Sequence, residues 1–229
     1  MCEMLAASFP EARPFSDLAE AAAGLEAYGL GSFGWGVAWL GDGVVRGTRG
    51  LGRFRDEGMT DERLRQTFSR RFLVHLRRPS QLSTIQMADT QPFFDGTASA
   101  WCHNGFLERA DELRHEFEDE LQGRADSEVG WRFFLRRRAE GLDACSALRA
   151  VDETFGGKAN LGVLSADGEL ALYSQNVTNR MWRFSIDEGD FASTDLHSDD
   201  SSVFDLVFPK AYDRQRVEAR TAFLLATAD

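Results

Sequence analysis

Cys2 follows Met1 directly, and its position gives it a possible chemical role. A cysteine in second place is small enough for an aminopeptidase to remove the methionine before it. The thiol would then share its residue with a free α-amino group, so a nucleophile and a base would lie a few bonds apart. The amine has a reference pKa of about 7.7–8.0, which suits a general base. The alternative is a strand thiol that only fills space.

His75 and Arg77 stand two residues apart in a run that is expected to form a strand. Both side chains therefore point to the same face. A guanidinium group offers a planar fork to a carboxylate, so Arg77 at the strand end is a candidate anchor for an amino-acid substrate. A structural ion pair is the alternative.

The tripeptide His103-Asn104-Gly105 ends a predicted strand at 98–103. The side-chain amide of Asn104 and the backbone N–H of Gly105 could together stabilise an oxyanion, since glycine lets the main chain approach a ligand closely. Asn-Gly is also a strong turn signal, so a tight turn without chemistry is the other interpretation.

Asp126 opens a predicted helix. Its carboxylate is a candidate N-cap. It is equally a candidate acceptor for a substrate ammonium group, and the two roles are compatible if only one oxygen caps the helix. Cys102 and His103 alternate across a strand and cannot both bind one metal ion, so neither a metal nor a cofactor is expected.

Short strands at both ends of the chain enclose a helical middle. Strands are predicted at 2–8, 34–40, 44–49, 71–77, 98–103, 159–165, 169–175, 180–186 and 203–208. Helices are predicted from Ser16, from Thr60 with Leu64 and Phe68 on the inner face, and over 107–121, 127–139 and 143–155. This order indicates an α+β domain with two sheets. Residues 78–97 have no steady periodicity and predict a long functional loop.

Composition and charge exclude several classes of protein. The chain has 229 residues, 43% hydrophobic and 28% charged, which fits one globular domain over 1–229. A net charge of −11 disfavours nucleic acids and anionic membrane surfaces as partners. There is no apolar run of about 20 residues and no signal-peptide pattern. Three distant cysteines form no disulfide framework, so we expect a cytoplasmic protein.

The order of the motifs is more specific than any one of them. The series runs Met1-Cys2-Glu3, Gly34-Trp35-Gly36, His75-x-Arg77, Asp89-Thr90-Gln91-Pro92-Phe93, His103-Asn104-Gly105 and Asp126-Ser127-Glu128. It resembles the glutaminase domain of class II glutamine amidotransferases, which are N-terminal-nucleophile hydrolases. It is most similar to the small stand-alone branch that includes the ergothioneine-pathway γ-glutamyl hydrolase.

The resemblance implies a fold, a reaction and a role for each candidate residue. The implied fold is a four-layer αββα sandwich with two stacked antiparallel sheets. Cys2 would be the nucleophile, Asn104 and Gly105 the oxyanion hole, Arg77 the α-carboxylate site and Asp126 the α-amino site. The implied reaction is hydrolysis of glutamine or a γ-glutamyl conjugate through a cysteine thioester, without a cofactor.

The chain departs from the family pattern on the pocket loop. Gln91 stands where many members have histidine, Arg78-Pro79-Ser80-Gln81-Leu82 replaces Trp-Ala-Thr-x-Gly, and Ala125 replaces a threonine. These changes bear on substrate identity more than on reaction type. Two further interpretations stay open: an ammonia-donating subunit that serves a separate synthetase chain, and a catalytically silent binding scaffold.

Overall fold

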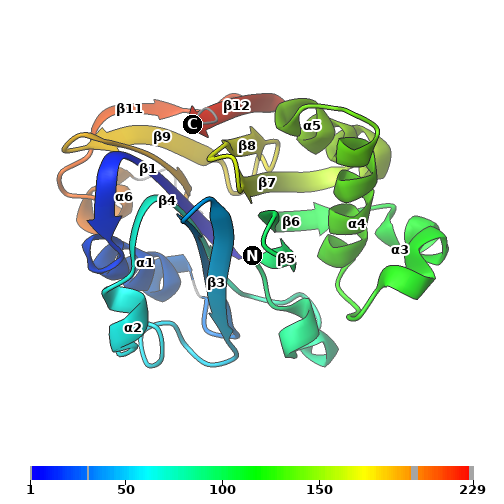
Figure 1. Cartoon of the computed structure of the whole chain (residues 1–229), viewed down its shortest axis with the longest axis horizontal. Coiled ribbons are helices and arrows are strands. Elements are labelled where there is room, and N and C mark those ends of the chain that lie inside the picture. Colours follow the sequence, from blue (N-terminus) through cyan, green and yellow to red (C-terminus); the bar gives the residue numbers. More distant parts are fainter. Residues whose placement is uncertain (1, 30, 197–200, 227–229) are drawn as a thin grey trace.

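A computed structural model describes residues 2–29, 31–196 and 201–226 of the chain. Two antiparallel sheets lie face to face, and helices cover their outer faces (Figure 1). The expected α+β architecture with two stacked antiparallel sheets is confirmed.

The first sheet has seven strands in the order β11-β9-β10-β1-β4-β2-β3. Their bounds are β1 Glu3–Pro14, β2 Trp35–Gly41, β3 Val44–Gly50, β4 Phe68–Leu76, β9 Met181–Ile186, β10 Gly189–Thr194 and β11 Tyr212–Arg216. The amino-terminal strand β1 is central, because it pairs with β10 on one side and β4 on the other. The sheet therefore fixes the start of β1, where Cys2 lies.

The second sheet has five strands in the order β12-β8-β7-β6-β5. Their bounds are β5 Phe93–Asp95, β6 Ser99–Leu107, β7 Gly157–Ser165, β8 Leu170–Ser174 and β12 Thr221–Ala226. The sheets meet over a core that includes Met4, Leu73 and Leu172. Gly162 of β7 lies at this contact, where an added Cβ would be 3.0–3.2 Å from those three side chains.

Helices form the two outer layers. Their bounds are α1 Ser16–Gly29, α2 Glu62–Arg65, α3 Ala110–Leu113, α4 Asp126–Ala139, α5 Ala144–Phe155 and α6 Ser201–Val207. Short 3-10 helices occupy Leu82–Thr84, Met87–Asp89 and Arg114–Glu120. Helices α1 and α6 share an apolar core with the seven-stranded sheet, and α4 and α5 share one with the five-stranded sheet. No helix within the described ranges is long and apolar enough to cross a bilayer.

The structure corrects the predicted end of the strand at 98–103. Strand β6 continues to Leu107 and pairs with β7 over its whole length, so Asn104 and Gly105 lie inside a strand and not in a turn. The turn signal of Asn-Gly is overridden because β7 supplies main-chain partners for this segment.

Other predicted elements were wrong or were missed. Residues 203–208 fall mostly in α6 and not in a strand, because a short apolar run fits either period. Phe68 begins β4 and is exposed, so it does not share an inner helix face with Leu64. The predicted helix at 107–121 divides into α3 and a 3-10 segment. Strands β5, β10, β11 and β12 were not predicted, and β5 lies inside the predicted loop at 78–97.

Phe72 and Phe68 provide a matched test of the apolar core between the seven-stranded sheet and helices α1 and α6. Phe72 is fully buried and contacts Phe9 and Phe15, whereas Phe68, on the same strand, is 62% exposed. We expect Phe72→Ala to lower the free energy of unfolding by about 3–5 kcal/mol. Phe68→Ala should change it by less than about 0.5 kcal/mol. Urea denaturation measures both, and equal losses would contradict the packing described.

Glu3 is a fully buried acid at the start of β1. The hydroxyl of Thr194 donates to its carboxylate, and the amide of Asn179 donates to it at 3.3 Å. Burial raises the pKa of Glu3 to about 8, although both donors act in the opposite direction. The carboxyl is therefore largely protonated at neutral pH.

The raised pKa of Glu3 predicts a loss of stability as pH rises from 6.5 to 8. The unfolded chain has already lost this proton above about pH 4.5, so folding takes a proton up, and the benefit disappears as pH approaches 8. His75 and His103, whose pKa values burial lowers, affect stability mainly below pH 6.5. We expect a fall of about 1–2 kcal/mol across this window.

The matched variant is Glu3→Gln, which keeps the shape and cannot ionise. Its free energy of unfolding should stay nearly flat between pH 6.5 and 8 in denaturation curves. A wild-type slope that persists in Glu3→Gln would assign the effect to another group.

Candidate active site

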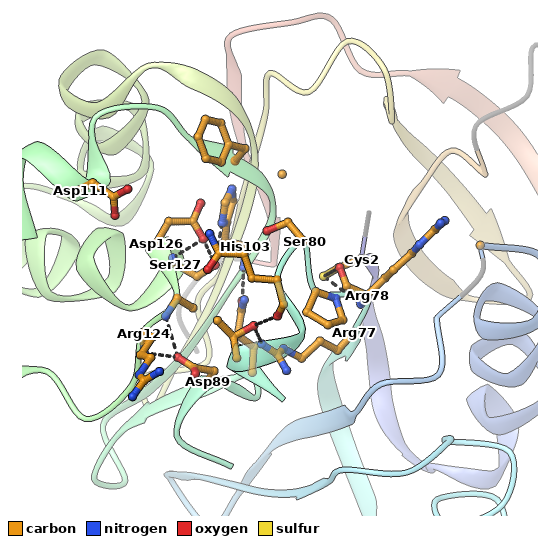
Figure 2. A pocket seen from close by; sticks show the side chains of 18 of the residues that line it. Cys2, Arg77, Arg78, Ser80, Asp89, His103, Asp111, Arg124, Asp126 and Ser127 are labelled. Atoms are coloured by element: carbon orange, nitrogen blue, oxygen red, sulfur yellow. Dashed lines mark hydrogen bonds between the residues drawn. The ribbon is translucent and has the colours of Figure 1, made fainter. Parts of the chain in front are cut away.

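A pocket of about 690 Å³ brings most of the predicted site residues together. Cys2, Arg77, Gly105 and Asp126 all line it. Figure 2 shows Cys2 and Arg77 on one side and Asp126 on the other. Asn104 does not line the pocket and lies directly behind Cys2, where its side-chain amide donates to the Cys2 carbonyl oxygen.

Cys2 presents its thiol at the pocket wall beside the main chain of Arg78. The Arg78 N–H donates to Sγ at 3.3 Å, and Sγ lies 3.6 Å from the Arg78 carbonyl oxygen. Burial raises the pKa of the thiol, although the Arg78 N–H lowers it. The thiol is therefore protonated at neutral pH, and a base is needed to make it a strong nucleophile.

Arg77 directly follows β4 and is 3% exposed. Its Nη2 donates to the Thr84 hydroxyl at 2.8 Å, whereas Nη1 is buried with no hydrogen-bond partner among the described residues. Within the same part of the chain, no carboxylate lies within 4.0 Å of the guanidinium, so the structural ion pair is not found. Burying a cation without an anionic partner is costly. Burial accordingly lowers the pKa of Arg77.

Gly105 and Asn104 face opposite sides of β6, as successive strand residues do. Gly105 has φ +146°, and a Cβ on it would lie 1.8 Å from the Lys158 carbonyl oxygen, so only glycine fits. Its neighbour Asn104 is fully buried and reaches Cys2 across the contact between the sheets. Gly105 therefore lies at the pocket, and the adjacent residue Asn104 lies in the contact between the two sheets.

Asp126 is the first residue of α4, and the N-cap position belongs to Ala125. The predicted N-cap role of Asp126 is therefore wrong by one position. One carboxylate oxygen accepts the Leu107 N–H and the other the Ser127 N–H, both at 2.8 Å. These bonds tie the start of α4 to the end of β6. Oδ1 also accepts the Ser127 hydroxyl at 3.3 Å, whereas Oδ2 keeps a further lone pair for a ligand cation.

Asp89 is a buried acid to which the sequence analysis gave no role. It accepts the N–H groups of Arg124 and Ala125 at 2.7 Å each, and the Gln86 side-chain amide at 2.8 Å. It thereby fixes the segment that leads into Asp126. Its partners lie 35 and 36 residues away along the chain, so no local pattern could have identified them.

His103 also lines the pocket and was not assigned to the site. Its Nδ1 lies 2.9 Å from the Ser127 hydroxyl, and its main-chain N–H donates to the side chain of Gln91. Gln91, which stands in place of a common pocket histidine, thus contacts β6. Burial lowers the pKa of His75 to about 3 and also lowers that of His103. Both imidazoles are neutral at physiological pH.

No three His, Cys, Asp or Glu side chains within the described ranges gather as ligands for a metal ion. The pocket lining instead offers one thiol, from Cys2, together with the guanidinium groups of Arg77, Arg78 and Arg124 and the carboxylates of Asp89, Asp111 and Asp126. Such a set suits an organic molecule that carries both charges.

Comparison with known proteins was made by family, by sequence and by structure. No family model matches the chain, and no curated protein matches it. Among solved structures, the glutamine phosphoribosylpyrophosphate (PRPP) amidotransferase from Bacillus subtilis has a TM-score of 0.73 at 16% identity. The match covers 98% of this chain and 49% of that one, so this chain spans about half the length of the amidotransferase.

Two shorter proteins are also similar. A glutamine aminotransferase class-II domain protein from Silicibacter pomeroyi has a TM-score of 0.59 at 16% identity, covering 84% of this chain and 88% of its own. A predicted glutamine amidotransferase from Pseudomonas aeruginosa has a TM-score of 0.52 at 13% identity, covering 99% and 100%. The chain therefore has the fold of class II glutamine amidotransferases, as the order of its motifs predicted.

Proposed function

We propose that this protein is an amidohydrolase that cleaves the γ-glutamyl amide of glutamine or of a γ-glutamyl conjugate, with Cys2 as nucleophile. The observation that carries the proposal is the Arg77 guanidinium. It is buried, its Nη1 has no partner among the described residues, and it lines the same pocket as the Cys2 thiol. A substrate carboxylate would satisfy this nitrogen.

The charged groups of the pocket suit a γ-glutamyl group, which carries a carboxylate and an ammonium group at one end and an amide at the other. The α-carboxylate would bind Arg77, and the α-ammonium group would bind Asp126 on the opposite wall (Figure 2). The amide carbonyl at the far end of the side chain would then meet the thiol of Cys2. The pocket volume of about 690 Å³ leaves room for a leaving amine larger than ammonia.

The proposed reaction begins after removal of Met1. The freed amine of Cys2 takes the thiol proton, and the sulfur attacks the amide carbonyl to form a tetrahedral intermediate. The Gly105 N–H on the pocket wall would stabilise its oxyanion together with the second N–H of Asn104 Nδ2, whose first N–H is bound to the Cys2 carbonyl oxygen. The C–N bond breaks and the protonated amine leaves, which gives a γ-glutamyl thioester. Water then adds to the thioester, releasing glutamate and restoring the thiol.

Two features of the pocket favour the α-amine as the base. Burial raises the pKa of Cys2, so the thiol does not ionise on its own at neutral pH. Burial also lowers the pKa of His103, which makes its imidazole a weak base, and its Nδ1 is already hydrogen-bonded to the Ser127 hydroxyl. The amine is attached to the same residue as the thiol and has a suitable pKa.

A second candidate function is the donation of ammonia to a separate synthetase chain. The observation that favours it is the fold, which this chain shares over 98% of its residues with the glutamine PRPP amidotransferase. Glutaminase activity that appears only when such a partner is present would support this candidate over the free hydrolase.

Cys2→Ala should abolish release of glutamate from glutamine and from γ-glutamyl-p-nitroanilide, because no other thiol lines the pocket among the described residues. Cys145→Ala is the matched control, since Cys145 is half-buried in α5, and it should retain wild-type turnover. Intact-mass measurement should show that Met1 has been removed. An active Cys2→Ala protein would exclude the thioester mechanism, and an inactive wild type would favour a silent scaffold.

Arg77→Lys should raise KM for the same substrates by about 10- to 100-fold, because a lysine cannot keep the Thr84 bond and also offer a fork to the carboxylate. Arg46→Lys is the control. The Arg46 side chain in β3 is exposed and does not line the pocket. Steady-state kinetics measure both, and a similar KM in the two variants would remove Arg77 from substrate binding.

A further inference from the structure

All four asparagines of the chain lie in one cluster behind Cys2. They are Asn104, Asn160, Asn176 and Asn179, and each is at most 1% exposed. Asparagine is mostly found at protein surfaces. Four buried amides in contact with one another are therefore a specific arrangement, and it lies where the two sheets meet at the nucleophile.

Hydrogen bonds at both ends fix the orientation of the Asn104 amide. Its Oδ1 accepts from Asn160 Nδ2 at 3.0 Å and from Asn176 Nδ2 at 3.2 Å. Its Nδ2 donates to the Cys2 carbonyl oxygen. Turning the amide over would set oxygen against oxygen at Cys2, and nitrogen against two amide nitrogens. The nitrogen is thus held toward Cys2.

The main chain sets the orientation of the two supporting amides. Oδ1 of Asn160 accepts the N–H groups of Gln175 and Asn176, both at 3.2 Å. A backbone N–H can only donate, so this oxygen cannot exchange places with Nδ2.

The second supporting amide is fixed in the same way. Oδ1 of Asn176 accepts the N–H groups of Thr178 and Asn179, both at 3.2 Å. The segment between β8 and β9 therefore determines which end of Asn104 faces the nucleophile.

We propose that Asn160 and Asn176 are positioning residues, which hold the Asn104 amide with its nitrogen toward the reacting carbonyl. This inference rests on the proposed function. Neither residue lines the pocket, so each would act through its bond to Asn104, although Asn160 Nδ2 also donates to the Asn179 carbonyl oxygen at 2.6 Å. A turned Asn104 would present a lone pair to the developing oxyanion. Loss of one oxyanion donor typically lowers kcat by about 10²- to 10³-fold.

The test uses two variants of Asn160 in the full-length protein. Asn160→Asp keeps the oxygen that accepts from Gln175 and Asn176, and replaces only the donating nitrogen. Asn160→Leu has a similar shape and adds no charge, but it removes the accepting oxygen as well as the donor. Gln175→Glu is the matched control. It makes the same amide-to-acid exchange on the segment between β8 and β9, and the Gln175 side chain contacts the Ala159 N–H rather than Asn104.

Hydrolysis of glutamine and of γ-glutamyl-p-nitroanilide measures the effect. We expect kcat to fall about 10- to 100-fold in both Asn160 variants, with KM within about threefold of wild type. Gln175→Glu should match the wild type. Alkylation of Cys2 by iodoacetamide, which needs no oxyanion site, should proceed within about threefold of the wild-type rate in all three variants, and so reports an intact fold and nucleophile.

Several results would overturn the inference. One is a normal kcat in both Asn160 variants. Another is a loss in Asn160→Asp alone, which would assign the effect to charge. A third is that the Asn160 variants, and Asn176→Asp as a further variant, lose both alkylation of Cys2 and activity. That result would mean that the asparagine cluster only maintains the fold. Absence of activity in the wild type would instead reject the proposed function.

Discussion

The hydrogen bond from the Asn104 amide to the Cys2 carbonyl oxygen is the contact on which the site depends. Asn104 belongs to the five-stranded sheet, and Cys2 directly precedes the central strand of the seven-stranded sheet. The bond therefore sets the position of the nucleophile relative to β6, and with it the distance from the thiol to Gly105. Apolar packing brings the sheets together without direction, whereas this amide fixes a register between them.

Placing polar groups between two sheets requires that they satisfy one another. Asn104, Asn160 and Asn176 do so with main-chain groups and with each other, and Glu3 contributes a carboxyl that burial keeps largely protonated. The pocket differs, because Arg77 Nη1 is buried there with no hydrogen-bond partner among the described residues. Hydrogen-bonding groups are therefore satisfied between the sheets, whereas the guanidinium beside the pocket keeps one donor for a ligand.

The sequence was sufficient for the fold class and for most of the pocket, because those depend on local pattern and on motif order. Cys2, Arg77, Gly105 and Asp126 line one pocket as expected. The features that the sequence did not predict depend on contacts between residues far apart along the chain. The Asn-Gly turn signal failed at Asn104 because β7 pairs with that segment, and Asp89 acts on main-chain groups 35 residues away. The asparagine cluster joins positions separated by 56 and 72 residues, without a motif.

The altered loop after Arg77 bears on whether the site is a working one. Its contacts with the nucleophile come from the main-chain N–H and carbonyl of Arg78, which any residue at that position supplies. Its contact with the anchor Arg77 comes from the Thr84 hydroxyl. The loop can therefore differ from the family pattern in side chains and still hold the thiol and the guanidinium. Arg78, Pro79, Ser80 and Gln81 line the pocket, so the departures from the family pattern lie on its wall while these contacts persist.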